Sequence, residues 1–246
     1  MEILKQNKMI NIQKISKLVL LGFIVTGFWA CNDNDPETFE VIGEVITSKR
    51  IIDGEEKFAL SYYAYSNMKM DSAKVNLPGD STLTLSEENA QKITYYYEPS
   101  DEDFSTTAPE SDAYEFLVTN KDVEYSAIED HVFTDVDIPT IDSVGVSTSI
   151  QTVYLEWNNN DDAENYVVLI LNEDDETIFI SYLISGSADS FTADENSGTW
   201  DNSLDTGSSY TVEVQAIIFE DDATNADYFY QIETKATASE EFTFDN

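Results

Sequence analysis

The sequence predicts an all-β protein made of two tandem β-sandwiches. Beyond residue 37 there is almost no helical periodicity, and short runs rich in Val, Ile, Tyr, Phe and Thr recur instead. Clusters of Asp, Asn, Gly, Ser and Pro separate these runs, as turns separate antiparallel strands. The stretch Asp137-Ile138-Pro139-Thr140 ends one series of runs and precedes another, so we place the boundary between the sandwiches there.

The first half, residues 38–138, contains strand-like runs and one segment with helical character. The expected strands are residues 39–47, 58–66, 74–77, 82–85, 93–98, 113–119, 123–128 and 132–136. The Ser-Glu-Glu opening of residues 86–92 favours a single helical turn. Seven or eight strands in about 100 residues fit an immunoglobulin-like sandwich.

The second half, residues 139–238, has a sharper pattern. Apolar residues alternate with polar ones up to Trp157, and a second run opens at Tyr166. The turn Leu204-Asp205-Thr206-Gly207-Ser208-Ser209-Tyr210 leads into a further alternating strand. This set resembles a fibronectin type III domain, with an inward Trp157. The resemblance implies that Tyr210 is the corner tyrosine, whose hydroxyl bonds back to the backbone. Residues 239–246 are expected to form a tail with some helical character.

The first 30 residues have the pattern of an export signal. A lysine-rich segment precedes the apolar run 18–30, which would span roughly 20 Å as a helix and is too short to cross a bilayer. The run ends at Ala30-Cys31, and acidic residues follow. This junction resembles the lipobox of Bacteroidota-type bacterial lipoproteins. The resemblance implies cleavage before Cys31, lipidation of its sulfur and an acidic tether over residues 31–37. An ordinary signal peptide with a free Cys31 is the alternative, and Met9 is an alternative start.

The composition restricts the function. The chain has 246 residues, with 49 Asp and Glu against 12 Lys and Arg, for a formal net charge of −37. This excess of negative charge argues against nucleic-acid binding and against electrostatic binding to anionic lipids. One Cys excludes an intramolecular disulfide, and the single histidine, His131, is expected near the surface of a strand. Because no catalytic or nucleotide-binding motif occurs, we expect no enzyme activity and no cofactor other than calcium.

Two sets of residues are candidates for contact with a partner. Tyr95 and Tyr97 share one face of a strand, where their rings can stack on a sugar or anchor a protein unless they fill the core. Val167, Leu169 and Leu171 make the second face of their strand apolar, although the outer face of a sandwich is usually polar. We expect this face to be covered by the first sandwich or, as the alternative, by an external partner.

Acidic turns provide a candidate calcium site. In a fibronectin-type topology the loops that contain Asp161, Asp162, Asp221 and Asp222 meet at one pole. Calcium prefers six to eight oxygen ligands, which converging carboxylates can supply, whereas solvated charge is the usual state of such loops. Asp135 and Asp137, beside Pro139, are a weaker candidate for an ion at the junction.

These features predict a lipid-anchored binding or adhesion module without catalytic activity. Its expected location is the outer membrane, facing the cell surface, with the periplasmic face as the alternative. The expected contacts are the membrane, through the lipid, and a protein or glycan partner. Two other functions fit the same residues: an accessory subunit or spacer of an envelope complex, and a glycan-capturing lipoprotein of an uptake system.

Overall fold

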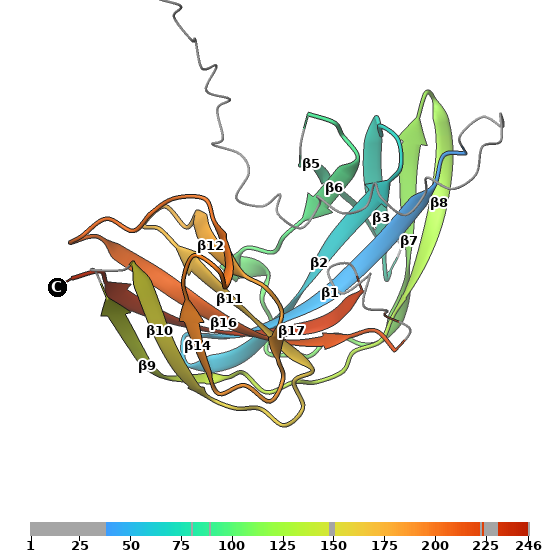
Figure 1. Ribbon diagram of the computed structural model, residues 1–246. Coiled ribbons are helices and arrows are strands. Elements are labelled where there is room, and N and C mark those ends of the chain that lie inside the picture. Colours follow the sequence, from blue (N-terminus) through green and yellow to red (C-terminus); the bar gives the residue numbers. More distant parts are fainter. Residues whose placement is uncertain are drawn as a thin grey trace, which may run out of the picture.

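The computed structural model describes residues 38–79, 81–88, 90–147, 151–221, 223 and 231–245, and strands dominate this part of the chain (Figure 1). Residues 1–37, which include Cys31, lie outside it, as does Asp222. Among the described residues, no helix is long and apolar enough to cross a membrane. The strands are β1 (Val41–Ile52), β2 (Glu55–Ser66), β3 (Ser72–Leu77), β4 (Ser81–Thr84), β5 (Ser86–Glu87), β6 (Thr94–Tyr97), β7 (Asp112–Asn120), β8 (Val123–His131), β9 (Thr140–Ser147), β10 (Thr152–Asn158), β11 (Asn165–Leu171), β12 (Thr177–Ser181), β13 (Ile184–Ser185), β14 (Ser190–Ala193), β15 (Gly198–Trp200), β16 (Ser209–Phe219) and β17 (Ile232–Thr243). The all-β prediction is confirmed.

The second half is a sandwich with the strand arrangement that its motifs predict. A sheet in the order β14-β10-β9 packs against β12-β11-β16-β17. Trp157 is 2% exposed and Tyr166 fully buried, with ring centroids 5.3 Å apart in the core. The backbone N–H of Asp205 donates to the Tyr210 hydroxyl at 2.8 Å, which is the contact expected of a corner tyrosine.

The first half is a second sandwich, in which the sheet β4-β3-β7-β8 packs against β1, β2 and β6. Alternate residues of β1 and β7 enter its core, including the fully buried Val45 and Phe116. The two sheets approach closely where Phe116 lies against Gly43 of β1, at a position with no room for a Cβ atom. Glycine at position 43 therefore lets the Phe116 ring fill the core.

One continuous sheet joins the two halves. The last strand, β17, pairs in parallel with β1, and the sheet has the order β15-β12-β11-β16-β17-β1-β2-β6-β5 (Figure 1). Register partners point to the same face, so Lys49 shares a face with Ala236, which packs in the second core. The two smaller sheets therefore cover the same face of the long sheet. The opposite face, which we call the inner face, carries a third apolar cluster: Ile46, Val167, Ile217, Phe219 and Ile232, with Tyr63, Leu169, Ile180, Leu183 and Ala223 partly buried against it.

Strand β1 is buried on both faces where it crosses from one half to the other. Residues 43–49 are all buried, although four of them have ionisable or hydroxyl side chains: Glu44, Thr47, Ser48 and Lys49. The Lys49 ammonium binds Asp135 at 2.9 Å, the Val136 carbonyl at 3.2 Å and Glu56 at 3.3 Å. Burial alone would lower the pKa of Lys49, but Asp135 and Glu56 outweigh it and raise the pKa.

Three local predictions differ from the structure. The helical turn predicted for residues 86–92 does not begin at Ser86, because Ser86 and Glu87 pair with β6 as a short edge strand. Residues 132–136 are not a strand, since Lys49 binds Asp135 and the Val136 carbonyl in place of a neighbouring strand. Residues 239–243, expected in the tail, continue β17 and pair with the start of β16.

Candidate functional site

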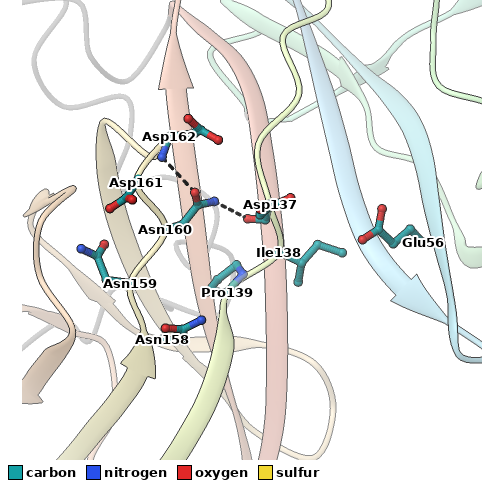
Figure 2. Close-up of a pocket in the computed structure, with 9 residues that line it drawn as sticks. All are labelled: Glu56, Asp137, Ile138, Pro139, Asn158, Asn159, Asn160, Asp161 and Asp162. Atoms are coloured by element: carbon teal, nitrogen blue, oxygen red, sulfur yellow. Dashed lines mark hydrogen bonds between the residues drawn. The ribbon is translucent and has the colours of Figure 1, made fainter.

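A polar pocket of about 410 Å³ lies between the loop after β10 and the connector that joins the two halves (Figure 2). Its lining residues are Glu56, Asp137, Ile138, Pro139, Asn158, Asn159, Asn160, Asp161 and Asp162. Glu56 comes from β2 in the first half, whereas Asn158 ends β10 and Asn159–Asp162 come from the loop between β10 and β11. The pocket therefore lies at the junction of the two sandwiches.

Asn160 organises this pocket. Its side chain is buried, donates to the Asp137 carbonyl at 2.8 Å and accepts the Asp162 N–H at 2.9 Å (Figure 2). Its backbone N–H donates to the Tyr166 hydroxyl at 2.8 Å, and that hydroxyl donates to Asn159 Oδ1 at 3.2 Å. These bonds tie the loop both to the connector and to the core of the second sandwich, so the pocket has a fixed shape.

The predicted calcium ligands are only partly brought together. Asp161 and Asp162 both line the pocket, with Asp137, but Figure 2 shows their carboxylates pointing in different directions. Asp221 is not among the lining residues, and Asp222 lies outside the described residues. In the described part of the chain, no group of three or more His, Cys, Asp or Glu side chains is placed to hold a metal ion.

Asp221 lies instead in a second group of acidic residues. Burial raises the pKa of Glu233, and the charges of Asp221 and Glu164 raise it further. The Glu164 carboxylate accepts the Phe219 N–H at 3.1 Å at the end of β16. These carboxyl groups lie where β16 and β17 leave the second sandwich, and Glu233 is only 7% exposed.

The two predicted tyrosines belong to the first core. Tyr95 is 5% exposed, and its hydroxyl donates to the Asp71 carbonyl at 3.2 Å. The half-buried Tyr97 ring packs against the same core, 6.2 Å from the ring centroid of Tyr62. A ring as buried as that of Tyr95 is not available to stack on a ligand, so this residue is corrected from a contact residue to a core residue.

The apolar face of β11 lies on the inner face of the long sheet. Val167 is 6% exposed and belongs to the same apolar cluster as Ile46 of the first half, while Leu169 is half-buried against this cluster. Leu171, at the end of the strand, is also half-buried. Residues of the first sandwich therefore extend this apolar face within the same sheet. Cover of the face by the first sandwich or by an external partner stays a prediction.

His131 is buried instead of lying near the surface. It is 3% exposed and its Nε2 lies 3.0 Å from the Thr47 hydroxyl, between β8 and β1. Burial lowers its pKa to about 4. Its ring also lies 6.3 Å from the ring centroid of Tyr114, so His131 packs in the first sandwich.

Sequence reasoning missed a second pocket, which contains Trp200. It has a volume of about 540 Å³ and lies at the end of the second sandwich, where β14, β15 and the start of β10 meet. The available signal was a tryptophan inside a run of small and polar residues, Asn196-Ser197-Gly198-Thr199-Trp200-Asp201-Asn202. Such surroundings leave a large aromatic ring partly uncovered.

No family model matches the sequence, and no curated protein matches it. Among solved structures, the chain is similar to the FN1–FN3 domains of chicken CNTN1, with 12% identity over 82% of this chain and 64% of that one, at a TM-score of 0.31. A two-domain fibronectin type III segment of chicken tenascin is 10% identical over 85% of this chain and 98% of that one, at a TM-score of 0.29. The BSP domain of a biofilm associated protein is 8% identical over 88% of this chain and 53% of that one, at a TM-score of 0.27. The chain thus spans less than two thirds of the first and third of these structures.

Proposed function

We propose that this chain is a non-catalytic binding or adhesion module of the bacterial cell envelope. The observation that carries the proposal is the continuous sheet that fuses the two sandwiches through β17 and β1. A shared sheet holds the outer surfaces of both halves at a fixed separation, which suits a protein that presents binding surfaces away from a membrane. The pockets and the charge of −37 support binding of a partner that is not an anionic polymer.

The proposed anchor is a lipid on Cys31, with the module at the outer membrane and facing the cell surface. One acyl chain binds a bilayer reversibly, whereas two or three hold a protein there stably. Mass spectrometry of protein purified from membranes will find a diacylglycerol thioether on Cys31 and no residues 1–30. The Cys31→Ser variant will leave the membrane fraction. An unmodified thiol or an intact leader would contradict the anchor while leaving the sandwich architecture intact.

The side of the membrane has its own test. Protease added to intact cells will digest the chain if it faces outward, while a periplasmic marker protein survives. Protection of the chain until the outer membrane is opened would place it on the periplasmic side instead. The binding function is tested by comparing adhesion or partner retention between cells with and without the protein.

A second candidate function is an accessory subunit or spacer of an envelope complex, and the inner face favours it. Leu169, Ile180 and Leu183 are only half-buried there, and the neighbouring Tyr182 is 61% exposed. Co-purification with a larger envelope protein that is lost in Leu169→Asp would support this function. Ile128→Asp is the matched control, because Ile128 is apolar and 69% exposed on the first sandwich.

Calcium binding remains a proposal for the junction pocket. Calcium is expected to raise the melting temperature relative to a chelator, and Asp161→Asn with Asp162→Asn is expected to remove the difference. A melting temperature that is independent of calcium would argue against the ion.

A further inference from the structure

We infer that the pocket at Trp200 binds a neutral saccharide through the indole ring. The inference names a ligand class for the proposed binding function, on which it rests. Trp200 is half-buried on β15, and its ring forms part of the wall of the 540 Å³ pocket. Small-molecule sites fall in the range of about 300–1,000 Å³, so the pocket has room for a mono- or disaccharide.

The indole ring is held in place from two directions. Its Nε1–H donates to the Asp194 carbonyl at 2.9 Å, and Phe179 packs against it with ring centroids 4.5 Å apart. Gly198 allows β15 to lie this close to β12, because a Cβ atom at position 198 would collide with the Ile180 carbonyl and the Phe179 ring. A ring that is already fixed loses little conformational entropy when a ligand stacks on it.

The turn beneath the ring is also preorganised. The Asp194 N–H donates to the Ser197 hydroxyl at 2.7 Å, and the Asn196 N–H donates to Asp194 Oδ1 at 2.8 Å. This turn connects β14 to β15 and presents its polar side chains at the pocket rim. The same backbone geometry therefore positions both the ring and its polar neighbours.

The rim has the hydrogen-bonding groups that a sugar requires. Beside the ring lie amide, hydroxyl and carboxylate side chains: Gln151, Thr152, Asp194, Glu195, Asn196, Asp201, Asn202 and Ser203. Carboxylates accept hydrogen bonds from a sugar's hydroxyl groups and amides both accept and donate them, while the aromatic ring covers the apolar C–H face of the sugar. None of the lining residues is Lys or Arg, so a sugar with acidic groups would be repelled.

Asp201 marks one contact point. It is half-buried, burial raises its pKa, and no hydrogen bond to its carboxylate is found among the described residues. Its backbone is fixed, because its N–H donates to the Ile178 carbonyl at 2.9 Å. A hydroxyl group of the ligand would donate to this carboxylate in place of water.

The test is binding of the full chain to an array of neutral oligosaccharides, followed by calorimetry with the best of them. Trp200→Ala is expected to weaken binding about tenfold or more, and Trp200→Phe less, because phenylalanine keeps an aromatic face. Asp201→Ala is expected to weaken it as well. The control is Tyr154→Ala, which removes an exposed ring of β10 outside the pocket and should leave binding unchanged.

Fluorescence gives a readout that a folding defect does not imitate. The saccharide should change the tryptophan emission of the wild-type chain, and the change should be absent from Trp200→Phe at a temperature where its melting curve shows that it is folded. Absence of binding to every neutral saccharide, or binding that survives Trp200→Ala, would overturn the inference. Adhesion or partner retention that persists in Trp200→Ala would overturn it while leaving the proposed binding function in place.

Discussion

At the scale of single residues, the most unusual group is Glu44. It is 2% exposed in the middle of β1, and its Oε1 accepts the Ile232 N–H at 3.1 Å. Burial raises its pKa from 4.5 to about 10, and the nearby charges of Glu220 and Glu129 contribute to the shift. Glu44 is therefore a protonated carboxylic acid at neutral pH, and its ionisation opposes folding.

Glu44→Gln should stabilise the protein at neutral and alkaline pH. The folded-state pKa lies above the unfolded value, so the native chain loses stability as pH rises from about 4.5 towards 10. Glutamine keeps an oxygen that accepts the Ile232 N–H but cannot ionise. At pH 8 the melting temperature of the variant should exceed that of wild type by about 2–4 °C for each kcal/mol gained in the free energy of unfolding. At pH 4.5 the two melting temperatures should differ little. A difference of equal size at both pH values would rule out ionisation as the cause.

His131 has the opposite pH dependence. Its folded-state pKa of about 4 lies below the ordinary 6.5. The contribution of the neutral ring to the free energy of unfolding is therefore complete above pH 6.5 and is lost as pH falls through 4. His131→Asn should lower stability at pH 7, since packing beside Thr47 is lost. Its deficit relative to wild type should shrink between pH 6.5 and 4. Denaturant unfolding across this range measures the deficit, and a constant deficit would contradict the buried neutral state.

At the scale of elements, the contact of β1 with β7 sets the spacing of the two sheets in the first sandwich. Gly43→Ala would push a methyl group into the Phe116 ring and should cost about 1–3 kcal/mol. In the Phe116→Leu background, the smaller side chain leaves room, so the same substitution should cost much less. Denaturant unfolding of the four chains gives this double-mutant cycle, and additive effects would show that the ring is not the obstacle.

The second sandwich was largely predictable because its signals are local. Three patterns carry the prediction: the alternation before Trp157, the run that opens at Tyr166 and the turn that ends at Tyr210. Each of them is made of residues that are close together in the sequence. Even the hydrogen bond of the corner tyrosine joins residues only five apart, Asp205 and Tyr210. Patterns of this kind need no knowledge of the rest of the chain.

The burial of β1 was not predictable for the opposite reason. A strand buried on both faces usually appears as an apolar run, but residues 43–49 include Glu44, Thr47 and Lys49. Their partners lie far away in sequence: His131 is 84 residues from Thr47, and Ile232 is 188 residues from Glu44. The junction pocket shares this difficulty, since Glu56 and Asp161 meet only once the two halves are joined.

At the scale of the whole molecule, the parallel pairing of β17 with β1 decides whether the halves behave as one body. Four residue pairs join these strands, from Thr47 with Thr234 to Arg50 with Thr237. On the β1 side, Lys49 also holds the connector that leads into the second sandwich. The hydrogen-bonded ladder and the contacts of the buried Lys49 ammonium thus link the two cores both through the sheet and through the chain.

This link predicts that damage to the first core will destabilise the second. Phe116→Ala should cost about 3–5 kcal/mol, because Phe116 is fully buried in the first core. Trp157 lies in the second core, and it is the reporter once residues 1–30 are removed and Trp200 is replaced by Phe. If β1 and β17 unfold together, the Trp157 signal will move to lower temperature with the loss of strand circular dichroism, in one transition. Two transitions, in which the Trp157 signal melts at the same temperature as in the chain that keeps Phe116, would show that the ladder transmits too little free energy to couple the sandwiches.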